Sequence, residues 1–309
     1  MMLVVDKVLI ITIDNRITFE NVLITMNRRH PFFIVLMLAI SASAFAQSVR
    51  RVPFEELEKR NGLYYHQNKA FSGNSLLFHP DDPKFKGKRK WQEIQWVNGK
   101  ISGFFKSWYE TGSRDMESTY SQGKRHGAYK TWFRNGKPEI VASYSQGHLE
   151  GVYTRFHSNG RKKKEAYFKH GKEDGMVTIW FENGQIEQKS EFSNGVPDGK
   201  SLAYNFSGEL RKEVEYKEGL RHGISVVYHK NGKIGEKTNY VEGLPNGQRS
   251  LFDAAGTKLS TETYVEGKLN GPKASFDLLG QVLEEQNYED GVLHGSYVKF
   301  VDNKIDTRG

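Results

Sequence analysis

The stretch YSQGKRHGAYKTWFRNGKP, from Tyr120 to Pro138, contains the pattern that decides the fold. Three glycines divide it: Gly123, Gly127 and Gly136. An aromatic residue stands three positions before the first glycine, and another stands five positions after the second. The predicted fold has to explain why glycines and aromatic residues stand at these fixed distances.

All three glycines recur with a period of 24 residues and without insertion or deletion. The first series is Gly99, Gly123, Gly147, Gly171, Gly195, Gly219, Gly243, Gly267 and Gly291. The second series is Gly103, Gly127, Gly151, Gly175, Gly199, Gly223, Gly247, Gly271 and Gly295. The third is Gly112, Gly136, Gly160, Gly184, Gly208, Gly232, Gly256 and Gly280, with Lys304 at the ninth position. A period of this length is the signature of a repeat architecture.

The aromatic residues keep the same register as the glycines. The series before the first glycine is Trp96, Tyr120, Tyr144, Phe168, Phe192, Tyr216, Tyr240, Tyr264 and Tyr288. The series after the second glycine is Trp108, Trp132, Phe156, Trp180, Tyr204, Tyr228, Phe252, Phe276 and Phe300. We expect these eighteen aromatics to form a ladder along one face of a sheet, where cross-strand pairs contribute roughly 0.2–1 kcal/mol each.

Each unit is predicted to form two short strands, exemplified by GAYKTWF and KPEIVASY. The first strand runs from the second glycine to an Asn-Gly turn, which occurs at Asn135, Asn159, Asn183 and Asn231 and is typical of type I′ hairpins. The other strand ends at the Gly-x-x-x-Gly turn, where His126, His222 and His294 are interpreted as turn residues rather than metal ligands. The predicted structural hinges include Gly123, Gly127, Gly136, Gly147, Gly151 and Gly160.

The predicted fold is therefore all-β, an elongated antiparallel sheet of stacked β-hairpins with about nine repeats. The composition agrees: the 309 residues include 31 glycines and 13% aromatics, which favours a thin, aromatic-lined core over disorder. The absence of cysteine excludes disulfides, thiol chemistry and Cys-based zinc sites.

The segment MNRRHPFFIVLMLAISASAFAQ, which begins at Met26, has the features of a secretory signal peptide. Arg28 and Arg29 form its basic region, an apolar run follows, and Ala44-Phe45-Ala46 is an A-x-A cleavage site. Residues 26–46 are the predicted signal peptide, and residues 1–25 are interpreted as an upstream extension that is not native. The alternative is a genuine strand-like extension, LVVDKVLIITI.

Because no cysteine follows the cleavage site, lipoprotein anchoring is excluded. The predicted location is periplasmic or at the cell envelope, with no transmembrane helix after cleavage. The chain after residue 46 has a formal net charge of +7, since the removed part contains four basic and three acidic residues.

The combination aromatic-x-x-Gly-x-x-x-Gly, a downstream aromatic and Asn-Gly resembles the MORN repeat in its variant form, the second MORN family, over about residues 96–303. The resemblance implies that each repeat is a β-hairpin and that hairpins add side by side. Where the better-known MORN unit has Tyr, this chain has Met116, Ile140, Lys164 or Gln188, which favours the variant family. A signal peptide followed by such repeats is similar to exported YwqK-type antitoxins.

The resemblance divides the chain into a leading part, residues 47–95, and a repeat domain, residues 96–309. The leading part contains an imperfect hairpin at 61–79 and a basic loop.

No catalytic, cofactor or metal motif is present in the sequence, and an enzyme is not expected. The leading hypothesis is that the protein is a scaffold that binds an unknown protein partner. A narrower form of this hypothesis is that the partner is a toxin-like protein. Its candidate contact residues are Trp108, Trp132, Trp180, Tyr109 and Phe133.

The alternative hypothesis is association with anionic lipid or envelope polymer through basic clusters. These are Lys84, Lys86, Lys88, Arg89 and Lys90, and Arg161, Lys162, Lys163 and Lys164. Nucleic acid is not expected as a partner of an exported chain.

Overall fold

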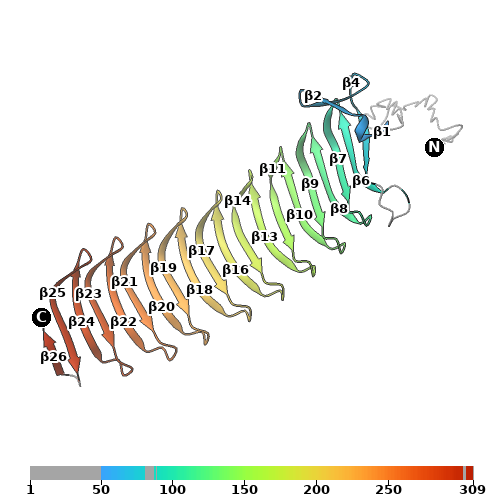
Figure 1. Ribbon diagram of the computed structural model, residues 1–309. Helices are drawn as coiled ribbons and strands as arrows, with labels where there is room; N and C mark the ends of the chain where they lie inside the picture. Colours follow the sequence, from blue (N-terminus) through green and yellow to red (C-terminus); the bar gives the residue numbers. More distant parts are fainter. Residues whose placement is uncertain (1–49, 81–86, 88, 302–303, 309) are drawn as a thin grey trace, which may run out of the picture. The chain divides into compact units, whose positions relative to one another are not determined.

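The computed structural model describes residues 50–80, 87, 89–301 and 304–308, and its main feature is one long sheet (Figure 1). The sheet has 23 strands, and apart from its first pair all neighbours are antiparallel. The described part contains no α-helix, only one 3-10 turn, η1 (Phe54–Glu56). The prediction of an all-β fold made of stacked antiparallel hairpins is confirmed.

The strands follow the chain order across the sheet. They are β1 (Arg51–Pro53), β5 (Gly73–Phe78), β6 (Lys90–Val97), β7 (Lys100–Trp108), β8 (Arg114–Ser121), β9 (Lys124–Trp132), β10 (Pro138–Ser145), β11 (His148–Leu149), β12 (Gly151–Phe156), β13 (Lys162–Lys169), β14 (Lys172–Glu173), β15 (Gly175–Trp180), β16 (Ile186–Ser193), β17 (Val196–Tyr204), β18 (Leu210–Lys217), β19 (Leu220–Tyr228), β20 (Ile234–Val241), β21 (Leu244–Phe252), β22 (Lys258–Val265), β23 (Lys268–Phe276), β24 (Val282–Glu289), β25 (Val292–Val301) and β26 (Lys304–Arg308).

A two-residue turn at the first glycine closes one edge of every hairpin. Gln122 and Gly123 have φ values of 50° and 84°, and Ser121 pairs with Lys124 across them. Positive φ at both central residues is what a type I′ turn requires. The turn therefore consists of the first glycine and the residue before it, whereas His126, interpreted from the sequence as a turn residue, lies within strand β9.

The Asn-Gly turns along the opposite edge are not type I′ turns, so that prediction is wrong. In the loop after β9 the amide of Gly136 donates to the carbonyl of Phe133, and the amide of Phe133 donates to the carbonyl of Lys137. Only Gly136, the last residue of this four-residue turn, has positive φ, 81°, as in hairpin loops whose turn ends in a left-handed glycine. The asparagine has another role: the Oδ1 of Asn135 accepts the amide of Lys137 at 3.0 Å.

The second glycine lies inside a strand, at a bulge. β9 begins at Lys124, three residues before Gly127, so the predicted start of this strand is wrong. Gly127 has a φ of 92°, and the pairing register shifts beside it, between Ser118 and Tyr120. In two repeats the strand is interrupted near this glycine, giving the separate pieces β11 and β12, and β14 and β15.

Neighbouring repeats are hydrogen-bonded to each other at both edges. At the edge with two-residue turns, the amide of Gly147 donates to the carbonyl of Arg125 at 2.8 Å, and the equivalent bond recurs through Gly291. At the other edge, the Nδ2 of Asn135 donates to the carbonyl of Ser158 in the next repeat at 2.9 Å. These bonds fix the register between repeats as well as within them.

A cap covers the start of the sheet. The short strands β2 (Glu58–Arg60), β3 (Leu63–His66) and β4 (Lys69–Ala70) form a separate three-stranded sheet. Phe54 of η1 and Tyr64 of β3 pack on Trp96 within a buried cluster.

The predicted leading hairpin, residues 61–79, is thus divided between two sheets, because β3 and β4 belong to the cap while β5 joins the main sheet. Strand β6 spans residues 95 and 96, so the leading part and the repeats share one sheet.

Candidate functional site: the tryptophan face

The two aromatic series lie on opposite faces of the sheet, and the prediction of a single-faced ladder is wrong. Side chains alternate between faces along a strand. Tyr144 pairs with Gly127, which is an odd number of residues from Trp132. Accordingly, Tyr144 packs on Tyr129 with ring centroids 5.4 Å apart, while Trp132 lies near the guanidinium of Arg114 at 5.7 Å.

We call the side that carries Tyr120 and Tyr144 the tyrosine face, and the side that carries Trp108, Trp132 and Trp180 the tryptophan face. The cap lies on the tyrosine face, where it contacts Trp96. No strand or turn among the described residues forms a second layer over the tryptophan face.

The three tryptophans are half-buried and each lies beneath a basic side chain. The Nζ of Lys90 is 5.6 Å from the ring centroid of Trp108, and the Nζ of Lys162 is 5.6 Å from that of Trp180. Each cation also forms an ion pair three residues along its strand, as Lys90 does with Glu93 at 3.2 Å. The row is therefore a stack of aromatic and cationic groups, in which each contact contributes about 0.5–1 kcal/mol at an exposed site.

The other two candidate contact residues, Tyr109 and Phe133, are at the edge of the sheet and not on this face. The hydroxyl of Tyr109 donates to the carbonyl of Trp132 at 2.6 Å, a bond between neighbouring repeats. Phe133 begins the loop that closes β9 and β10. Burial and the nearby Asp115 raise the pKa of Tyr109, so its hydroxyl stays protonated and remains a donor.

An exposed apolar cluster in the middle of the tryptophan face was missed in the sequence. Val152, Tyr167 and Met176 lie on β12, β13 and β15 with exposed fractions of 58%, 47% and 48%. Val152 pairs directly with Tyr167. Phe156 and Trp180 lie on the same face of β12 and β15, four residues further along each strand, with Thr154 and Thr178 between them and the cluster. Exposed apolar patches of this kind are characteristic of interaction sites.

A shallow hollow lies on the same face over β7, β8 and β9. Its volume is about 170 Å³, and its lining includes Phe104, Lys106, Glu117, Ala128 and Lys130. This is smaller than the ~300–1,000 Å³ typical of small-molecule sites. It can receive a side chain but not a whole cofactor.

The predicted basic cluster Arg161–Lys164 does not form one patch. Arg161 donates to backbone carbonyls of the next loop, Lys162 lies on the tryptophan face, and Lys164 pairs with Glu173 on the tyrosine face. Lys163 is exposed between them. Alternation along β13 separates the four charges.

The other basic cluster is described only in part. Lys84, Lys86 and Lys88 lie outside the described residues. Arg89 donates to the carbonyl of Glu110, and Lys90 belongs to the tryptophan row.

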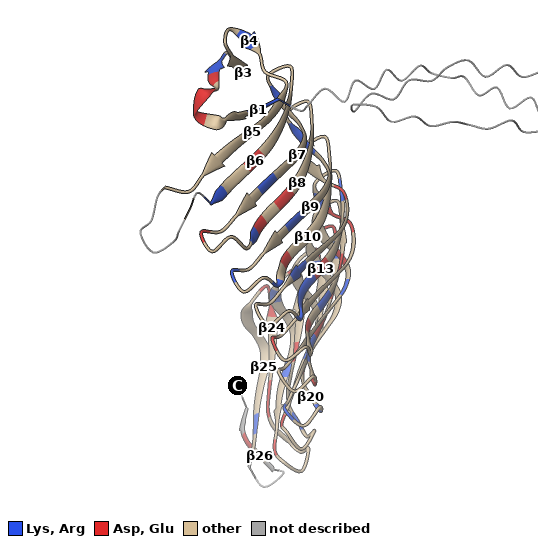
Figure 2. Cartoon of the chain, turned by 90° about the vertical axis from the view of Figure 1, so that its right-hand side faces the viewer, with Lys and Arg blue, Asp and Glu red and all other residues tan. Residues whose placement is uncertain are grey.

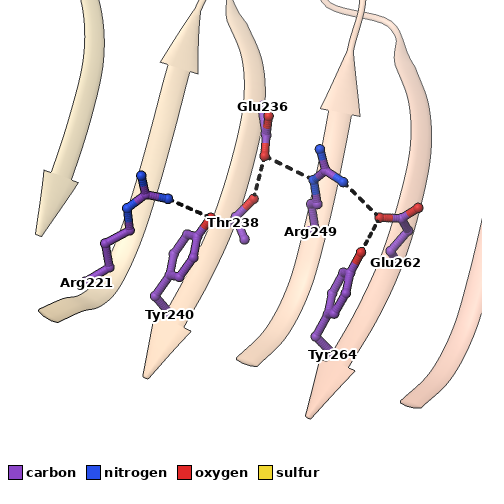
Figure 3. Close-up of polar contacts among 7 residues, drawn as sticks. All are labelled: Arg221, Glu236, Thr238, Tyr240, Arg249, Glu262 and Tyr264. Atoms are coloured by element: carbon purple, nitrogen blue, oxygen red, sulfur yellow. Dashed lines mark hydrogen bonds and ion pairs between the residues drawn. The ribbon is translucent and has the colours of Figure 1, made fainter. Parts of the chain in front are cut away.

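The tyrosine face changes from aromatic to ionic along the array. In its last third, Arg249 donates to Glu236 at 3.0 Å and to Glu262 at 3.2 Å, and Tyr264 donates to Glu262 at 2.9 Å (Figure 3). Lys273 lies 3.5 Å from the same carboxylate. Burial opposes ionisation of Glu262, but the bond from Tyr264 and the charges of Lys273 and Arg249 prevail and lower its pKa. The network contains balanced charges and holds neighbouring repeats together.

No metal site is formed by the part of the chain that the structure describes, since no three His, Asp or Glu side chains there converge. His126, His222 and His294 lie within β9, β19 and β25 near the bulges. The described residues also contain no helix with the length and apolarity of a membrane span.

Comparison with known families identifies part of the array. Four segments match the model of the MORN repeat variant: residues 125–146, 149–170, 173–194 and 221–242. No curated protein matches the chain. The fold and these four segments define a β-hairpin repeat scaffold that contains MORN-variant repeats. Similarity to the YwqK-type antitoxins stays a prediction.

Proposed function

We propose that this protein is a non-catalytic, exported scaffold that binds a protein partner through its tryptophan face. The observation that carries the proposal is the exposed cluster of Val152, Tyr167 and Met176 on a sheet face that no second layer covers. Repeat proteins use long regular surfaces of this kind for partners. Phe156 and Trp180 lie further along β12 and β15 on the same face, and aromatic residues are enriched among those that dominate binding energy.

The test is cross-linked capture with the tagged chain expressed in its native cell. The triple variant Val152→Ser, Tyr167→Ser and Met176→Ser should lose a stoichiometric partner that the wild type retains. The matched control is Leu220→Ser, Leu244→Ser and Val292→Ser, which removes three apolar side chains of similar exposure beside the two-residue turns. Equal retention by both triple variants would contradict the assignment of the face.

Export rests on the signal-like sequence at residues 26–46. Its test is mass spectrometry of the native protein, which should begin at Gln47. Peptides from residues 1–25 would contradict both the cleavage and the interpretation of the extension.

A toxin-like partner is the narrower form of this proposal, supported only by the resemblance of the sequence layout. Identification of the captured protein decides it.

The alternative function is association with anionic lipid or envelope polymer, and the excess of basic residues near the start of the repeats favours it. Residues 89–164 contain 15 Lys and Arg against 6 Asp and Glu, whereas residues 165–309 contain 18 against 23. Flotation with anionic vesicles at low salt, lost at high salt, would support this alternative.

A further inference from the structure

The hollow on the tryptophan face is flanked by two lysines whose charges are not neutralised locally. Lys106 of β7 and Lys130 of β9 each pair in register with Glu117 of β8. The carboxylate of Glu117, however, lies 3.4 Å from the guanidinium of Arg114. Neither lysine forms an ion pair with any other described residue. On the other side of Lys106, Glu93 of β6 pairs in register with it, but the Glu93 carboxylate already forms an ion pair with Lys90.

The surroundings of the two lysines make the surface positive and partly apolar. Lys106 is half-buried over the ring of Phe104, with its Nζ 5.1 Å from the centroid, while Lys130 is exposed. Figure 2 shows basic positions on β6, β7 and β9, and acidic positions on β8, the strand between β7 and β9. Glu93 and Glu117 are paired with Lys90 and Arg114, so Lys106 and Lys130 leave an excess of positive charge, which attracts anionic partners and raises their association rate.

The spacing of the lysines distinguishes among anions. They stand two strands apart, or about 10 Å, because neighbouring strands are about 4.8 Å apart. A phosphate monoester carries nearly two charges on one group and is bound best where several donors converge. Two separated ammonium groups instead match single carboxylates spaced along a chain. Glu117, between them, supplies an acceptor for a hydroxyl or amide group of the same ligand.

We propose that this hollow binds an acidic segment of a protein, with carboxylates on Lys106 and Lys130 and an apolar or aromatic side chain over Phe104 and Ala128. The proposal rests on the proposed function and specifies the chemistry of the partner. The apolar cluster at Val152 and Tyr167 lies further along the same face and would continue the contact.

The test uses a fluorescein-labelled random copolymer of Glu and Tyr, with binding to the whole protein followed by anisotropy. We expect binding that weakens with salt and that falls by about tenfold or more in the variant Lys106→Glu with Lys130→Glu. The matched control is Lys189→Glu with Lys237→Glu. These lysines lie on β16 and β20, on the tryptophan face and in line with Lys106 and Lys130, but in later repeats. Binding by this control should equal that of the wild type. Lys106→Gln with Lys130→Gln provides a milder variant should charge reversal affect folding.

Three results would overturn the proposal. They are no binding of the copolymer, equal loss in the lysine variant and its control, and preference for phosphatidylglycerol vesicles or inorganic polyphosphate over the copolymer. If the captured partner is lost on changing Val152, Tyr167 and Met176 but is retained by the lysine variant, the proposed function stands and the acidic-segment inference fails.

Discussion

The side-chain amide of Asn159 donates a hydrogen bond to the carbonyl oxygen of Glu182 at 2.9 Å, across the boundary between two repeats. The Oδ1 of the same side chain accepts the amide of Arg161, also at 2.9 Å. One asparagine therefore closes its own loop and attaches the next one. The arrangement recurs at Asn135, Asn183 and Asn231.

Replacing Asn159 should separate these two roles. Asn159→Asp keeps the acceptor but removes the donor, and should lower the free energy of unfolding by about 1 kcal/mol, the contribution of one hydrogen bond. Asn159→Ala removes both and should cost about 1–2 kcal/mol. Urea unfolding measures the difference.

The control for this pair is Ser207→Ala, in a loop where Asn205 supplies the acceptor instead. Its effect should stay within about 0.5 kcal/mol. Equal effects at Asn159 and Ser207 would show that the bond between repeats contributes nothing.

The two-residue turns offer a stabilising substitution. Glu242 has a φ of 48° before Gly243, a conformation that disfavours most side chains and that asparagine tolerates better. Glu242→Asn should raise the free energy of unfolding by about 0.5 kcal/mol, and the reciprocal Asn194→Glu should lower it by a similar amount. Glu242→Gln controls for the charge. A stabilisation by Gln as large as that by Asn would point to charge rather than backbone conformation.

The 24-residue period was sufficient to predict the hairpins, their antiparallel stacking and the need for glycine. It did not predict which of the two turns has type I′ geometry. Asn-Gly is typical of type I′ turns in general, whereas here the asparagine side chain forms a hydrogen bond to the next repeat. Nor did it predict the two faces. The register shifts beside Gly127 and between Pro138 and Ile140 change which side chains are opposite one another, and these shifts leave no mark in the spacing of the aromatics.

The candidate site was predicted in part for a related reason. Trp108, Trp132 and Trp180 were found because they keep the period. The apolar cluster at Val152 and Met176 was missed because its positions vary between repeats: Ala128 and Lys200 occupy the equivalent places. Residues that recognise one particular partner are expected at positions where the repeats differ. Periodicity in the sequence therefore does not reveal them.

The bulge glycines provide a matched pair for separating strain from crowding. Gly127 and Gly151 have φ values of 92° and 83°, so alanine at either position should cost about 1–2 kcal/mol in backbone strain. A Cβ at Gly127 would also lie 2.6 Å from the Oγ1 of Thr119, whereas at Gly151 it would meet nothing within 4 Å. Gly127→Ala should therefore be the more destabilising.

The cause of that difference can be tested by a double-mutant cycle. Thr119 donates to the carbonyl of His126 at 2.5 Å, and Thr119→Ala removes the crowded hydroxyl. In this background the cost of Gly127→Ala should fall to that of Gly151→Ala. An undiminished cost would assign the effect to the backbone alone.

The ionic network on the tyrosine face should make the last repeats sensitive to acid. The pKa of Glu262 in the folded protein lies below its ordinary value of 4.5, so the folded state favours the carboxylate. This stabilisation is complete above pH 4.5 and is lost as the pH falls through the lowered pKa.

Glu262→Gln removes this stabilisation, and the variant should lose less stability than the wild type between pH 6 and acidic conditions. Thermal unfolding over that range measures the difference, with Glu266→Gln, a turn residue outside the network, as the control. Parallel acid profiles for wild type and Glu262→Gln would show that the bonds from Tyr264 and Arg249 do not stabilise the charged form.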